Sequence, residues 1–164
     1  KQLIDPDFHV RVLEVLEKYN VPAGQLQVEI TEAAALVENK ATSVNLGSLH
    51  RAGVNIAMDD FGVGHSSLLY LRTQPITTLK IDGSLSRDVQ ENPANLGIIA
   101  TIYDLCQLLN VKTVVEYVDN QAQLEKLMDI GTFLIQGYLY SPPVSGSEIQ
   151  KFARDLERSG MGEG

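Results

Sequence analysis

The sequence is poor in cysteine and in positive charge, and both shortages narrow what the protein can do. Among its 164 residues there is one cysteine, Cys106, which lies in an apolar stretch with a helical pattern. It cannot form an internal disulfide, so it fits a reducing compartment and a place in the core. Lysine and arginine number 13 against 21 acidic residues, the formal net charge is −8, and no Lys/Arg-rich run is present. We therefore expect no groove that grips DNA or RNA through its phosphates.

Long apolar runs and a signal peptide are also missing. No stretch reaches the roughly 18 apolar residues of a membrane span, and the first residues do not resemble a secretory leader. We expect no membrane segment in this piece and a cytoplasmic location, or the cytoplasmic side of a membrane-anchored parent. The 44% hydrophobic and 21% charged content is typical of one globular domain. We assign residues 1–158 to that domain and residues 159–164 to a flexible tail.

Segments with helical and strand-like patterns alternate from end to end. Strands are predicted at residues 26–30, 54–58, 78–81, 113–116 and 133–136. Helices are predicted at about residues 5–20, 40–52, 66–73, 84–90, 95–109, 120–130 and 145–158. Strands separated by helices in this way indicate βα units of a parallel sheet, in an open doubly wound fold or a (β/α)₈ barrel. No Gly-x-Gly-x-x-Gly follows the first strand, so the dinucleotide-binding fingerprint is missing.

Two adjacent carboxylates close the second predicted strand. Asp59 and Asp60 follow an apolar run, and Gly62 and Gly64 come directly after them. Two neighbouring acids repel unless a cation lies between them or one of them holds a proton. A divalent metal is the simplest such cation, whereas a solvated turn is the competing interpretation, because Asp and Gly are common turn residues. This segment alone leaves both interpretations open.

One polar pattern recurs in all five predicted strands. Side chains alternate between the two faces of a strand, and each strand carries a polar side chain at or near its carboxyl end on the less apolar face. These side chains are Glu29, Asp59, Lys80, Glu116 and Gln136. A snorkelling lysine or a solvated strand end explains any one of them. Five consecutive strands that end in this way predict a polar site, at the edge where α/β folds build their active sites.

The acids of this predicted site indicate a divalent metal. Glu29, Asp59, Asp60 and Glu116 offer hard oxygen ligands, and no cluster of His or Cys competes with them. This donor set favours Mg²⁺ or Mn²⁺ over Zn²⁺. Magnesium commonly meets a phosphate substrate, and so acidic a chain needs a metal or a local cation to accept an anion. Lys80 is suited to orient a water or to balance phosphate charge.

Five segments, in order, resemble the motifs of the EAL domain family, bacterial signalling phosphodiesterases that open cyclic di-GMP to linear pGpG. The segments are residues 29–32, 59–68, 79–82, 115–119 and 136–138. The resemblance covers nearly the whole chain. It implies an α/β fold of the TIM type, a (β/α)₈ barrel that is present here as a partial barrel with about five βα units. It also implies a site for Mg²⁺ or Mn²⁺ and cyclic di-GMP at the carboxyl face.

The resemblance also implies roles for the acids and the lysine at the strand ends. Glu29, Asp59 and Asp60 would be metal ligands. Lys80 would hold the nucleophilic water, and Glu116 would assist catalysis near the metal.

The remaining implied roles concern the substrate and the loop after the acid pair. Gln136 would lie beside the substrate or a metal-bound water. Glu32, Gly62, Gly64 and Ser66 would support the loop, which commonly also supports dimerisation. The implied partners are therefore a second copy of the chain and fused sensory or diguanylate-cyclase domains.

The chain departs from the family pattern at several positions. Val63 and His65 replace a threonine and a tyrosine of the loop, and Tyr117 and Asp119 replace a glycine and a glutamate. The Glu-Ala-Leu signature and an asparagine ligand, which belong upstream of Lys1, do not occur. We expect the complete domain to be a metal-dependent phosphodiesterase and this piece alone to be inactive or very weak. The alternative is a non-catalytic EAL-like receptor or interaction module, and a third is another metal-dependent barrel phosphohydrolase.

Overall fold

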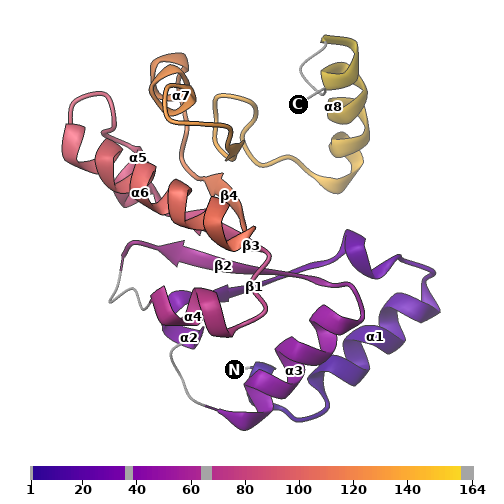
Figure 1. Ribbon diagram of the computed structural model, residues 1–164. Helices are drawn as coiled ribbons and strands as arrows, with labels where there is room; N and C mark the ends of the chain where they lie inside the picture. Colours follow the sequence, from indigo (N-terminus) through magenta and orange to yellow (C-terminus); the bar gives the residue numbers. More distant parts are fainter. Residues whose placement is uncertain (1, 36–38, 64–67, 160–164) are drawn as a thin grey trace.

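The computed structural model describes residues 2–35, 39–63 and 68–159 (Figure 1). The strands are β1 (Gln27–Thr31), β2 (Asn55–Phe61), β3 (Thr78–Ile81), β4 (Lys112–Val115) and β5 (Leu134–Ile135). The helices are α1 (Phe8–Lys18), α2 (Glu32–Ala35), α3 (Lys40–Arg51), α4 (Leu68–Thr73), α5 (Gly83–Ser86), α6 (Pro93–Leu109), α7 (Gln121–Met128) and α8 (Gly146–Ser159), with 3-10 turns at Gln2–Ile4 and Ala23–Gln25. Within the described ranges, no helix combines the length and the apolar character that crossing a membrane requires.

The five strands form one parallel sheet in the order β1-β2-β3-β4-β5. Each strand therefore pairs with its neighbour in the chain, and a connection that contains a helix leads from one to the next. Among the described residues, β1 and β5 are the two edges of the sheet. The prediction of a parallel α/β fold built from five βα units is confirmed.

Asparagine side chains set several of the helix boundaries. Asn39 accepts hydrogen bonds from the first amides of α3, and Asn92 does the same for α6, whose first residue is Pro93. Asn120 forms a capping box with Gln123 at the start of α7. These side chains satisfy amides that have no partner within the helix.

The structure corrects several predicted boundaries. The second strand runs on to Phe61 instead of ending at residue 58, the helix expected at 84–90 is the single turn α5, and β5 has two residues instead of four. Helix α2, which starts at Glu32, was not predicted. Ser159, assigned to the tail by its composition, belongs to α8, and residues 160–164 of that tail lie outside the described residues. Asp82 caps the start of α5 by accepting a hydrogen bond from the Ser84 N–H, and the helix ends at Ser86.

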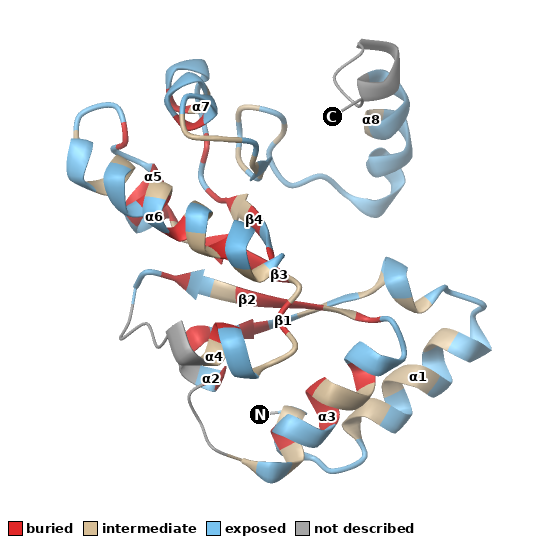
Figure 2. Ribbon diagram, in the orientation of Figure 1, coloured by how far each residue is buried: buried red, intermediate tan, exposed pale blue. Residues whose placement is uncertain are grey.

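The core lies on both faces of the central strands. Figure 2 shows that buried residues concentrate in the strands, whereas α8 is largely exposed. Ile56 and Met58 point to one face of β2 and Ala57 to the other, and all three are at most 1% exposed. Burial on both faces is usual for parallel sheets, whose crossover segments cover them. The predicted polar edge of the sheet is therefore surrounded by well-packed strands.

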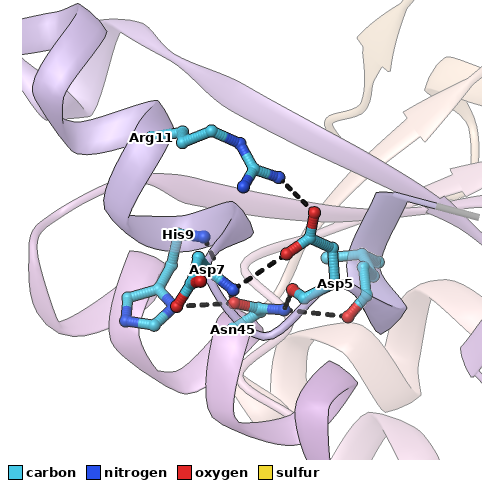
Figure 3. A network of polar contacts seen from close by, with 6 residues as sticks. Asp5, Asp7, His9, Arg11 and Asn45 are labelled. Atoms are coloured by element: carbon cyan, nitrogen blue, oxygen red, sulfur yellow. Dashed lines mark hydrogen bonds and ion pairs between the residues drawn. The ribbon is translucent and has the colours of Figure 1, made fainter.

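A polar network attaches the start of the chain to α3 (Figure 3). The Asn45 amide donates to the carbonyl oxygens of Leu3 and Asp5, both at 2.8 Å. Its oxygen accepts hydrogen bonds from the backbone N–H and from the Nδ1 of His9, at 3.2 and 2.6 Å. An exposed ion pair between Arg11 and Asp5, at 2.6 Å, lies beside it. All the hydrogen-bonding capacity of the buried Asn45 side chain is thus used to pack α1 on α3.

Candidate metal and catalytic site

A bulge at the carboxyl end of β2 aims two carboxylates at one place. Met58 pairs with Leu79 and Phe61 pairs with Ile81, so two residues, 59 and 60, oppose the single residue 80 of β3. Bulges of this kind bend a strand and redirect its side chains. Asp60 has a φ of 58°, a left-handed conformation that short polar residues tolerate better than others.

The result is a cluster of three acids. One carboxylate oxygen from each of Asp59, Asp60 and Glu116 lies within 4.8 Å of the other two. The predicted strand at residues 54–58 leaves Asp60 beyond its end. The structure places Asp60 within β2, and the bulge brings its carboxylate to the cluster.

Lys80 joins the ends of four strands. Its Nζ lies 3.1 Å from Glu29 Oε2, 2.9 Å from Asp59 Oδ1 and 2.9 Å from Glu116 Oε1. The register of the sheet explains the meeting, because Glu29 pairs with Ala57, and Lys80 with Val114, so that the strand-end residues share one face. The Lys80 side chain is only 7% exposed. It is therefore not a snorkelling surface lysine.

The surroundings of Lys80 keep its ammonium charged. Burial by itself lowers the pKa of Lys80, but its hydrogen bonds to Asp59, Glu116 and Glu29 outweigh burial and hold the pKa above its ordinary value. A single cation that faces three carboxylates remains protonated at any physiological pH.

The same arrangement has the opposite consequence for Glu116. Burial raises the pKa of this carboxyl; Lys80 lowers it in part, and the Asp59 and Asp82 carboxylates raise it further. The pKa values of Lys80 and of Glu116 are both raised, because Lys80 faces three acids, whereas Glu116 faces one ammonium and two more acids. Carboxyls with a raised pKa in an acidic cluster are common at catalytic sites.

Gln136 takes a different place from the other strand-end residues. It is exposed and lines a pocket of about 530 Å³ together with Glu116, Tyr117 and Tyr138. Apolar side chains that follow β5, Pro142 and Phe152 among them, complete the wall. The pocket adjoins the acidic cluster through Glu116. Its lining suits a planar organic group next to a charged centre.

The loop-support residues are only partly visible. Gly62 has a φ of 104°, which favours glycine, and a Cβ on it would lie 2.6 Å from Leu85 Cδ1 and would displace that side chain. Glu32 is 6% exposed, and its two carboxylate oxygens accept no hydrogen bond from the described residues. Gly64, Ser66 and the departing residue His65 lie outside the described residues. The predicted brace between Glu32 and this loop stays a prediction.

The sequence did not predict the contacts that several residues make around Glu116. Ser86 Oγ donates a short hydrogen bond to the Glu116 carbonyl oxygen. Asp119, the shorter acid that departs from the family pattern, accepts a hydrogen bond from the Tyr138 N–H at 2.9 Å and so joins the loops after β4 and β5. Contacts like these link residues far apart in the chain, so spacing within a motif does not reveal them.

Comparison with known proteins identifies the family. The family model for the EAL domain matches residues 1–143. The chain belongs to the EAL domain family. EAL domains of known structure are TIM-type barrels, and the five-stranded parallel sheet is consistent with part of such a barrel.

Individual EAL proteins are similar along most of the chain. The cyclic di-GMP phosphodiesterase PdeF of Escherichia coli is 38% identical over 136 residues, which are 83% of this chain and 18% of PdeF. The crystal structure of the EAL domain of Mycobacterium smegmatis DcpA matches with a TM-score of 0.88 at 33% identity, over 94% of this chain and 69% of that one. A manganese and cyclic di-GMP complex of Klebsiella pneumoniae BlrP1 matches with a TM-score of 0.79 at 29% identity, over 84% of this chain and 35% of that one. The chain spans about a fifth of the length of the curated relatives that it matches.

Proposed function

We propose that this EAL domain, in its complete natural form, hydrolyses cyclic di-GMP to linear pGpG with Mg²⁺ or Mn²⁺. The observation that carries the proposal is the meeting of Lys80 with Glu29, Asp59 and Glu116 from three other strands. A structural ion pair needs one partner for each charge. A buried lysine among several acids instead fits a centre that handles water and phosphate.

The acids fit a divalent metal. The three oxygens from Asp59, Asp60 and Glu116 are close enough to share one ion, and a single ammonium does not balance the four carboxylates of the site. We propose Glu29, Asp59 and Asp60 as the metal ligands, as the family resemblance implies, although in this structure Glu116 lies in the acid cluster and Glu29 contacts Lys80. All are hard oxygen donors, as Mg²⁺ and Mn²⁺ prefer. When bound, the metal would polarise the phosphate and lower the pKa of a water.

The protein's own groups would position that water and move its proton. Lys80 carries three N–H donors, which face Glu29, Asp59 and Glu116 here. Once Glu29 and Asp59 bind a metal, the donors that face them would be available for the attacking water or a phosphate oxygen. Glu116, with its raised pKa, would assist the transfer of the water's proton. Water oxygen adds to phosphorus as the P–O3′ bond breaks, and the proton ends on the leaving 3′ oxygen. Gln136 would contact the substrate from the pocket wall.

The other expectations from the sequence are also proposals. We infer a homodimer through the loop after Asp60, because the resemblance to the EAL domain family implies that role for the loop. Fused sensory or diguanylate-cyclase domains are supported by the small share, 18%, of PdeF that this chain covers. A cytoplasmic location, and weak or no activity of the 164-residue chain by itself, remain predictions.

The test is hydrolysis of cyclic di-GMP by the complete natural protein, with the linear product separated by chromatography. We expect turnover with Mg²⁺ or Mn²⁺, loss of turnover with a chelator, and a fall of about 1,000-fold or more in Asp59→Asn. Asp5→Asn, a matched change in the network of Figure 3, should leave turnover unchanged. Full activity in Asp59→Asn would refute the proposed metal-dependent hydrolysis.

A non-catalytic receptor for the dinucleotide is the second candidate. Tyr117 occupies a position where the family has glycine, is 43% exposed and lines the pocket beside Glu116. An added ring favours binding of a base without requiring chemistry. Metal-independent binding of cyclic di-GMP without any product would favour this candidate. Failure to bind any cyclic dinucleotide would leave a role in protein interaction.

A further inference from the structure

The peptide that links Glu116 to Tyr117 has an unusual conformation. Tyr117 has a φ of 57°, in the left-handed region that a residue with a Cβ rarely adopts. The conformation follows directly after a residue of the proposed catalytic centre. Surrounding contacts must therefore hold it.

Helix α5 and the residue after it supply those contacts. The Arg87 guanidinium carbon lies 4.1 Å from the centre of the Tyr117 ring. The ring also packs tightly on Gly83, where an added Cβ would lie 2.4 Å from Tyr117 Cδ2. Ser86 donates its short hydrogen bond to the Glu116 carbonyl oxygen, next to the same peptide. One short helix thus contacts both sides of this linkage.

Gln123 extends the brace to the far end of the loop. Its Nε2 donates to the carbonyl oxygens of Ser86 and Arg87, at 3.3 and 3.1 Å. Its Oε1 accepts from the Asp119 N–H at 2.7 Å. Gln123 is 3% exposed, so these hydrogen bonds are protected from water. The chain from β4 to α7 is therefore tied to the end of α5.

We propose that Arg87 and Tyr117 form a positioning pair, whose stacked side chains hold the backbone after Glu116 so that its carboxylate stays at Lys80. The proposal rests on the proposed function, in which Glu116 assists the reaction. Glu116 is held on one side by the hydrogen bond of its N–H to the Ile81 carbonyl oxygen, at 3.1 Å. The stacked pair holds the other side. Small displacements of a catalytic group slow the chemical step more than they weaken binding.

A pocket wall is the competing role for Tyr117. The ring lines the pocket, so a change at Tyr117 alone also alters the surface that a substrate meets. Arg87 does not line that pocket. A wall residue changes KM, whereas a positioning pair changes kcat and requires both partners.

The experiment uses the complete natural protein and compares Tyr117→Phe, Tyr117→Leu, Arg87→Met and the double variant that combines Tyr117→Leu with Arg87→Met. Leu is apolar and lacks the ring face that a guanidinium stacks on, whereas Phe retains it. The exposed pair of Lys18 and Tyr19 on the other side of the molecule, at 5.2 Å, provides the matched control Lys18→Met. The readouts are kcat and KM for cyclic di-GMP, and hydrogen exchange of the Glu116 and Val118 amides.

We expect kcat to fall about tenfold in Tyr117→Leu and in Arg87→Met, with KM within about twofold. The double variant should fall no further, because the two side chains act as one unit. Tyr117→Phe should regain most of the kcat that Tyr117→Leu loses, and Lys18→Met should match the wild type. The Glu116 and Val118 amides should exchange faster only in the variants without the stack.

Each other result counts against the pair. Unchanged kcat in both single variants, a change confined to KM, or independent losses that multiply in the double variant would overturn it. An inactive wild type would refute the proposed function instead. Exchange at the two amides would then decide the pair, since equal exchange in all variants overturns it and faster exchange in Tyr117→Leu and Arg87→Met but not Tyr117→Phe upholds it.

Discussion

The polar network around Asn45 and the one around Lys80 differ in how their charges and hydrogen bonds are balanced. Asn45 is fully buried, and its amide and oxygen are used by Leu3, Asp5 and His9 (Figure 3). Lys80 is almost as deeply buried, yet it faces three carboxylates at once. In the first network, which we call the balanced network, every hydrogen-bonding group of Asn45 has a partner. In the second, which we call the unbalanced network, three carboxylates face one ammonium.

This difference separates a structural network from a candidate functional one. Buried polar groups normally have partners, and an unbalanced group calls for an explanation. The excess of acids around Lys80 leaves capacity for a cation. Glu32, at the same edge, has two buried oxygens that accept no hydrogen bond in the described part of the chain. Predictions at matched positions in the two networks test this separation.

The largest effect is expected at the centre of the unbalanced network. In Lys80→Met, kcat for cyclic di-GMP should fall about 1,000-fold, because no other described side chain places an ammonium between the acids. Steady-state hydrolysis by the complete protein measures this fall. Asn45→Ala should leave kcat near the wild-type value. Activity of Lys80→Met within tenfold of wild type would remove the distinction between the networks.

A change in the balanced network should affect stability strongly, although it hardly affects kcat. Asn45→Ala removes four hydrogen bonds from a buried site and takes away the acceptor of the His9 N–H. We expect the free energy of unfolding to fall by about 3 kcal/mol. Asn55→Ala, which loses one hydrogen bond to the Gly24 carbonyl, is the control and should cost about 1 kcal/mol. Urea unfolding measures both, and equal losses would contradict the special weight given to Asn45.

Alkaline pH should weaken the unbalanced network selectively. Burial lowers the pKa of Lys80, but the three carboxylates outweigh it, so the folded state holds the proton more tightly than the unfolded state does. The stabilisation is therefore fully present below the ordinary pKa of 10.5 and is lost as pH rises through the higher folded value. The difference in unfolding free energy between wild type and Lys80→Met should be constant below pH 10.5 and shrink above it. A difference that stays constant as the pH rises through this range would contradict the prediction.

The smallest effect is expected at the exposed rim of the balanced network. Arg11 and Asp5 form an ion pair at 2.6 Å, but their side chains are 55% and 46% exposed. Exposed pairs contribute little, because water solvates both charges well. Arg11→Met should therefore cause no measurable shift of the unfolding midpoint. A clear loss of stability would show that the network needs its surface charge as well as Asn45.

Alternation along each strand was sufficient to find most of the site. The parity of Glu29, Lys80 and Glu116 placed them on one face, and the observed register brings their charged groups to one point. The pattern of five βα units likewise predicted a parallel sheet, but it left the arrangement open between an open doubly wound fold and a barrel. Both predictions rest on the two-residue period of a strand, which is local.

Other features needed contacts between distant segments. The bulge at Asp59 and Asp60 is visible only in the pairing of β2 with β3, and so the strand was predicted to end too early. The short helix α5 was predicted too long, because its end depends on packing and not on an apolar stripe. The stacking of Arg87 on Tyr117 joins residues 30 positions apart, as does the hydrogen bond of Ser86 to Glu116.

The sequence by itself therefore identifies the acidic edge of the sheet, the single lysine at that edge and the resemblance to the EAL family. It can do so because the type of a side chain and the strand face that it occupies are properties of short segments. They do not reveal that Lys80 is shared by three acids, that a bulge places Asp60 within β2, or that Arg87 stacks on Tyr117. Those depend on distances between strands and loops. The balance of burial against pairing that sets the pKa of Lys80 and Glu116 also exists only once the fold has brought these groups together.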